Sequence, residues 1–121
     1  MTITKEIWLK ATAEAMSTEA CKELFANDST MEDLFTDYSF SLFQLLSGKT
    51  LKRVDFIKEV GDFSAELLKE IGMGTTNVLV NIALMCFANQ IWKNMANLAE
   101  TERISKEYDN FRGVLKSQKS E

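Results

Sequence analysis

The stretch from Ile71 to Trp92 spans 22 residues without a charged side chain, although 26% of the whole chain is charged. Its middle, residues 78–88, is apolar at every position except Asn81. A helix that is apolar on all sides has to be surrounded by the rest of the protein, by a partner or by lipid. The fold of the chain depends on which of these covers it.

A membrane is the weakest of the three alternatives. The apolar run at 78–88 has only 11 residues, whereas about 20 are needed to cross a bilayer. Polar residues flank it on both sides within the uncharged stretch: Thr75, Thr76, Asn77, Asn89 and Gln90. We therefore expect the stretch to be a core helix or a protein interface.

The remaining sequence predicts an all-α, single-domain bundle of five to six helices. A chain of 121 residues fits one domain, 45% of it is apolar, and proline is absent. We find no linker, no repeat and none of the sustained alternation that strands require. The helical domain is expected to cover residues 1–116, with a central apolar helix at about 76–99 and a frayed tail at 117–121.

Capping and periodicity place the helices at about 4–15, 17–27, 29–47 and 50–71, followed by the central helix. Ser17, Thr50 and a capping box formed by Ser29 and Glu32 are the expected starts. Gly48 is expected just past the end of the third helix. On the fourth helix, Val54 and Ile57 belong to the predicted inner stripe. The segment 72–77 reads as a loop, with Thr75 or Thr76 as the next cap.

From Glu100 the chain becomes strongly charged and keeps only a sparse apolar stripe. Its members are spaced by four, three and four residues: Ile104, Tyr108, Phe111 and Leu115. This segment either extends the central helix or restarts as a separate helix near Thr101.

The chain has no histidine, which removes the commonest general base and metal ligand. Di-iron sites with Glu-x-x-His pairs and histidine-ligated haem are excluded for the same reason. Cys21 and Cys86 are too far apart in sequence to form a ligand-spaced zinc pair. We expect no catalysis, no cofactor and no metal. Because no secretory signal is visible, we also expect a cytoplasmic protein with reduced thiols.

Nucleic acid is a weak candidate partner. Residues 34–60 can be read as a helix-turn-helix whose basic side chains face DNA phosphates: Lys49, Lys52, Arg53 and Lys58. However, Asp55 and Glu59 interrupt that face. Residues 48–70 hold five basic and five acidic side chains, and the whole chain has a net charge of −4.

An acidic face is predicted near the N-terminus. Residues 1–47 contain eight acidic and three basic side chains, and four acidic ones cluster: Asp28, Glu32, Asp33 and Asp37. A solvated face at a helix start explains this cluster. A docking site for a basic partner is the alternative.

Eight aromatic and methionine side chains could line an apolar cavity for a small molecule: Phe35, Phe40, Phe43, Phe56, Phe63, Phe87, Met85 and Met95. The simpler interpretation is that they fill the core. The central helix nevertheless carries more apolar surface than a bundle of this size is expected to cover. Such surplus is typical of an interface.

The leading hypothesis is a non-enzymatic protein-binding module of the adaptor, chaperone, inhibitor or immunity type. We expect this module to act as a homodimer. Its predicted interface lies on the central helix: Leu79, Ile82, Phe87, Ile91, Trp92 and Met95. A helical carrier of an apolar small molecule and a DNA-binding regulator are the alternatives.

Overall fold

The computed structural model describes residues 1–70 and 78–119, which form five α-helices and no strand. They are α1 (Lys5–Met16), α2 (Glu19–Asn27), α3 (Ser29–Leu46), α4 (Arg53–Glu70) and α5 (Val78–Lys119). The prediction of an all-α bundle is confirmed. The predicted loop at 72–77, with its caps Thr75 and Thr76, lies outside the described residues, as does Ile71 at the end of the predicted fourth helix.

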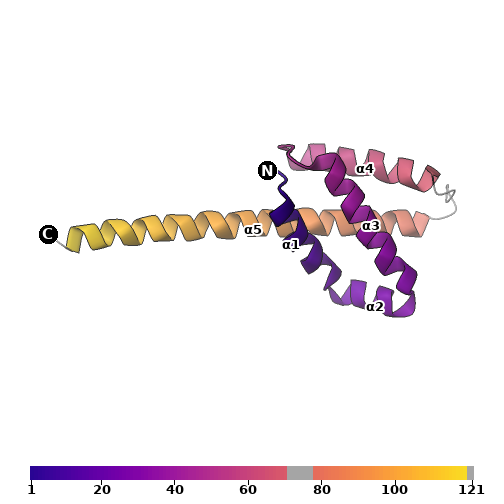
Figure 1. Cartoon of the computed structure of the whole chain (residues 1–121), viewed down its shortest axis with the longest axis horizontal. Helices are drawn as coiled ribbons and strands as arrows, with labels where there is room; N and C mark the ends of the chain where they lie inside the picture. The colour runs from indigo at the N-terminus through magenta and orange to yellow at the C-terminus, as the bar shows by residue number, and fades with distance from the viewer. Residues whose placement is uncertain (71–77, 120–121) are drawn as a thin grey trace.

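The molecule consists of a helical head and a projecting arm (Figure 1). α1, α3 and α4 pack around the first part of α5, with α2 at one side, and α4 runs antiparallel to α5. The second part of α5 leaves the head and ends at the C-terminal tip. We call residues 100–119 the arm, because each of them is exposed. At 1.5 Å per residue, the arm is about 30 Å long.

α5 is one uninterrupted helix of 42 residues. The sequence left open whether the central helix breaks near Thr101, and the structure shows that it does not. The structure describes α5 as helical up to Lys119, which lies within the tail at 117–121 that is predicted to fray. No helix among the described residues meets the length and hydropathy needed to span a membrane.

The N-caps of α2 and α3 each lie one residue away from the predicted ones. Thr18, rather than Ser17, caps α2 by accepting from the Cys21 amide. Asp28 caps α3 through a 3.0 Å bond from the Thr30 amide, so the predicted capping box at Ser29 is wrong. Each replacement has an oxygen on a short side chain and an extended backbone, as an N-cap requires.

The connection between α3 and α4 is tied to the N-terminal residues. Gly48 adopts a φ of 78°, as expected just past a helix end, and its amide donates to the Ile3 carbonyl at 2.9 Å. The Thr50 hydroxyl bonds that of Thr2 at 2.7 Å instead of capping a helix. α4 therefore begins at Arg53, three residues later than predicted.

The core lies where α1, α3 and α4 meet the first part of α5. Its largest fully buried side chains come from all four helices and the N-terminal segment: Trp8, Tyr38, Phe56, Ile3, Leu42, Leu46, Leu84, Ile91 and Met95. On α4 the buried stripe is Phe56, Val60, Ser64 and Leu68. The prediction that Val54 and Ile57 point inward is wrong, because they are 76% and 42% exposed.

Buried hydrogen bonds fix how the helices pair. The Trp8 indole Nε1 donates to Ser39 Oγ at 3.0 Å, joining α1 to α3. Tyr38 and Ser64 share a 2.8 Å hydroxyl bond between α3 and α4. Asn94 Nδ2 donates to the Ala11 carbonyl at 3.1 Å, joining α5 to α1. Each bond satisfies a polar group that would be costly to bury alone.

Candidate protein interaction surface

The predicted interface on the central helix is largely core. Phe87, Ile91 and Met95 are 4%, 0% and 0% exposed, and Trp92 is half-buried with its ring 4.7 Å from that of Phe56. The expectation that these side chains form an outer docking surface is therefore corrected. α1, α3 and α4 wrap more of the central helix than the sequence indicated.

Two of the six predicted interface residues do face outward. Leu79 is 82% exposed and Ile82 is 52% exposed. Both lie near the start of α5, at the end of the head opposite the arm. They are one turn of helix apart and form a small exposed pair, not a continuous surface.

The predicted acidic cluster is solvent-facing. All four residues are exposed, from the N-cap of α3 to its middle: Asp28, Glu32, Asp33 and Asp37. Asp28 has a structural task, because its carboxylate accepts from both the amide and the hydroxyl of Thr30. Glu32, in the first turn, also lies at the positive end of the helix dipole. The cluster is explained by helix capping and hydration.

An exposed apolar stripe runs along the arm. Ile104, Tyr108, Phe111 and Leu115 are 52%, 61%, 63% and 42% exposed. Their spacing of four, three and four places them on one face of the helix. We call these four residues the arm stripe. The spacing was visible in the sequence. That the head leaves the stripe uncovered became apparent only from the structure.

The arm stripe is not a continuation of the core face of α5. Met95 is fully buried against the head, and Ile104 follows it nine residues later. At about 100° per residue, nine residues correspond to roughly two and a half turns, so the two side chains point to opposite sides of the helix. The arm stripe therefore faces away from the direction in which the head covers α5.

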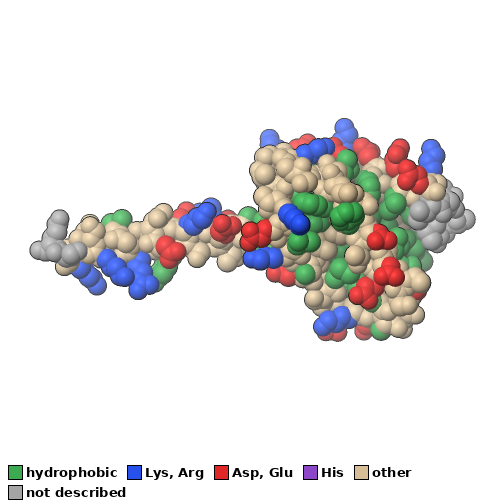
Figure 2. Space-filling view, in the orientation of Figure 1, with side chains coloured by type: hydrophobic (Ala, Val, Ile, Leu, Met, Phe, Trp, Pro, Cys, Tyr) green, Lys and Arg blue, Asp and Glu red, His purple; other side chains and the backbone are tan. Residues whose placement is uncertain are grey.

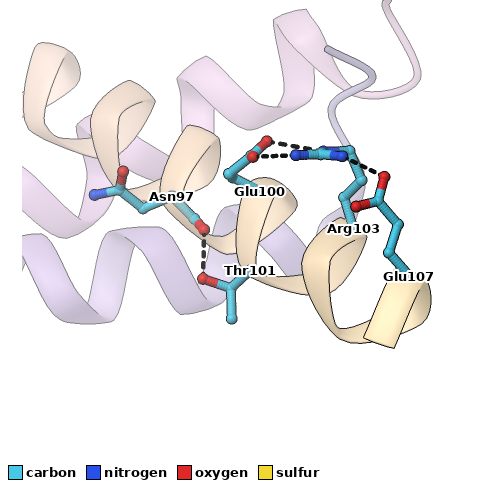
Figure 3. A network of polar contacts seen from close by, with 5 residues as sticks. All are labelled: Asn97, Glu100, Thr101, Arg103 and Glu107. Atoms are coloured by element: carbon cyan, nitrogen blue, oxygen red, sulfur yellow. Dashed lines mark hydrogen bonds and ion pairs between the residues drawn. The ribbon is translucent and has the colours of Figure 1, made fainter. Parts of the chain in front are cut away.

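Ion pairs along the helix stabilise the base of the arm (Figure 3). The Arg103 guanidinium bonds Glu100 and Glu107, each with one contact of 2.5 Å. These bonds raise the pKa of Arg103 and lower that of Glu100. Lys106 lies 3.4 Å from Glu102 one turn earlier. Pairs at this spacing support a helix without tertiary contacts.

Charge is divided along the arm. Residues 100–109 carry four acidic and two basic side chains, a net charge of −2. Residues 110–119 carry three basic side chains and no acidic one, a net charge of +3. In Figure 2 the blue side chains gather toward the tip and the red ones lie nearer the head. The arm thus combines an apolar stripe with two halves of opposite charge.

The head also has an apolar groove of about 330 Å³ between α2, α3 and α5. Phe35 and Phe87, two of the aromatic residues predicted to line a cavity, border it. Cys21 and Cys86 border it as well, and both thiols are free. The other predicted lining residues do not border this groove. Phe56 and Met95 are core, and Phe40 is 60% exposed. The remaining three are partly buried against the core: Phe43, Phe63 and Met85.

No protein-family model, curated protein or solved structure matches this chain. The surface of the described residues therefore has to indicate the function.

Proposed function

We propose that this protein is a non-enzymatic protein-binding module that acts through the arm stripe. The observation that carries the proposal is a row of four exposed apolar side chains on a helix that projects beyond its own core. Large apolar side chains in a row are costly to leave in water, and their burial against another helix is the usual remedy. An adaptor, chaperone, inhibitor or immunity-type role in the cytoplasm fits such a surface.

The polar side chains inside the head support a structural rather than a catalytic use. Tyr38, Ser39 and Ser64 are buried. The Tyr38 and Ser64 hydroxyls bond each other between α3 and α4, and the Ser39 hydroxyl accepts from the Trp8 indole. Among the described residues, no group of three or more His, Cys, Asp or Glu side chains could hold a metal ion.

A matched pair of variants tests this proposal. Phe111→Glu places a charge in the arm stripe, whereas Asn110→Glu places the same charge on the neighbouring residue, off the stripe. Each chain is used as bait for affinity capture from native-cell extracts. We expect wild type and Asn110→Glu to retain a partner protein, which can be a further copy of this chain, and Phe111→Glu to lose it. Equal retention by all three chains, or no retained protein, contradicts the proposal.

The groove between α2 and α5 favours a second candidate function, the enclosure of an apolar small molecule. Its volume of about 330 Å³ is at the lower end of ligand pockets. Native mass spectrometry of the purified chain tests it: a co-purified ligand that is lost in Ala83→Trp, which fills the groove, supports this candidate. A bare wild-type chain contradicts it.

A further inference from the structure

We propose that the arm stripe binds a second copy of this chain, and that the two arms pair as an antiparallel coiled coil. This inference rests on the proposed function, because it names the partner of the same surface. It is supported by the periodicity of the stripe, by its symmetry within the arm and by the distribution of charge.

The periodicity is that of a two-stranded coiled coil. Alternating steps of four and three residues place Ile104 and Phe111 at d positions of a heptad and Tyr108 and Leu115 at a positions. A repeat of 3.5 residues keeps such a seam on one side of the helix over its length. The seam covers most of the 20 residues of the arm, so a helix of similar length is its natural partner.

The stripe is symmetric about the middle of the arm. When a second arm is reversed about the point between Asp109 and Asn110, Ile104 meets Leu115 of the second copy. Tyr108 then meets Phe111 of the second copy. Each a position faces a d position, as antiparallel coiled coils require. The two arms overlap over their full length, from residue 100 to residue 119.

Charge favours the antiparallel direction. Reversal sets the −2 half of each arm beside the +3 half of the other. A parallel pair would instead align the two acidic halves and the two basic halves. Parallel pairing would offer one contact between Glu107 and Arg112, but Glu107 already bonds Arg103 of its own helix at 2.5 Å.

The position of the head leaves this pairing open. Because the arm stripe faces away from the side on which the head covers α5, a second arm can approach the stripe without displacing α1, α3 or α4. In the antiparallel arrangement the two heads lie at opposite ends of the paired arms. The result is a dumbbell-shaped dimer.

Sedimentation equilibrium of the full chain tests the pairing itself. We expect wild type to form a dimer, and we expect Asn110→Glu to dimerise with the same Kd. Phe111→Glu places a charge in the seam twice per dimer, so we expect a rise in Kd on the order of 100-fold. The helical circular dichroism of the head controls for folding, because Phe111 touches no core. A monomer at all concentrations, or equal dimerisation of both variants, overturns the proposal.

Distances between spin labels test the direction. Glu102→Cys and Asp109→Cys, each in a Cys21→Ala and Cys86→Ala background, place one label per chain at equivalent heptad positions. In the antiparallel dimer, the two labels at residue 109 are nearly level, whereas those at residue 102 are separated by about 22 Å along the axis. We therefore expect a longer label distance at 102 than at 109. Equal distances indicate parallel arms and overturn this proposal.

These outcomes separate the two proposals. A monomeric chain that still loses a captured partner through Phe111→Glu defeats the second-copy inference and leaves the protein-binding function intact. If Phe111→Glu changes neither self-association nor partner capture, both the second-copy inference and the protein-binding function are contradicted.

Discussion

At the scale of single residues, the buried hydroxyl groups of the head have measurable consequences. Burial raises the pKa of Tyr38 from 10.0 to about 12, and the hydrogen bond with Ser64 offsets part of that rise. The neutral phenol is therefore the form that the folded head accommodates. Its hydroxyl is held at 2.8 Å from Ser64 between α3 and α4.

Tyr38 is expected to make the fold sensitive to alkali. Because the folded pKa lies above the unfolded value, the unfolded chain loses this proton first. The contribution is complete below pH 10 and is lost as pH rises toward 12, a loss on the order of 2–3 kcal/mol. Urea unfolding at a series of pH values measures it, with Tyr38→Phe as the control that lacks the group. Equal alkaline slopes in both chains would show that this assignment is wrong.

The caps show what a sequence can and cannot resolve at this scale. Asp28 and Ser29 are both good N-cap residues, as are Ser17 and Thr18, and propensity does not separate neighbours of equal quality. Backbone geometry does, because Asp28 and Thr18 have the extended conformation that a cap needs. Helix existence was therefore predictable, and helix starts were predictable to within a few residues.

At the scale of elements, two glycines have opposite roles. Gly48 follows the end of α3 and has a positive φ, which residues with a Cβ adopt only at an energetic cost. Gly61 lies within α4, where an added Cβ would meet no atom within 4 Å. A glycine inside a helix often permits a close approach or marks a bend, but α4 is continuous through Gly61 and open around it.

These glycines predict opposite changes in the free energy of unfolding. We expect Gly61→Ala to stabilise the head by about 0.5–1 kcal/mol, through helix propensity. Gly48→Ala should destabilise it by about 1–2 kcal/mol, because of its left-handed backbone. Denaturant titration of both variants beside wild type provides the comparison. Changes of the same sign would contradict the local accounts given for them.

The central helix shows why an element's surroundings were harder to predict than the element. Periodicity and the absence of charge identified residues 76–99 as a helix that needs cover. They did not say that α1, α3 and α4 supply it, because that depends on how distant segments cross. Phe87, Ile91 and Met95 were therefore assigned to an interface and lie in the core. The arm stripe was visible as a spacing, but its exposure was not.

At the scale of the whole molecule, the head and the arm are built on different principles. The head is held by apolar burial and by buried hydrogen bonds between helices. The arm is held by its own backbone and by ion pairs between successive turns. A bare helix of about 20 residues is only marginally stable in water, so a partner on the arm stripe would stabilise the arm itself.

Opposite charges on the two halves of the arm predict that salt weakens the dimer. Raising NaCl from 0.05 to 0.5 M shortens the screening length, and we expect Kd to rise roughly 3- to 10-fold. Arg112→Gln combined with Lys119→Gln should flatten this dependence, because it removes charge from the basic half. Sedimentation at both salt concentrations measures the effect. A Kd that is independent of salt in wild type would argue against charge pairing between the arms.

Hydrogen exchange of the arm amides reports whether a second copy of this chain covers the arm stripe. We predict that amides 104–115 of wild type and Asn110→Glu become more slowly exchanging as protein concentration rises, while those of Phe111→Glu remain fast. Fast exchange in all three chains at every concentration, with the head protected, would contradict the pairing of two arms.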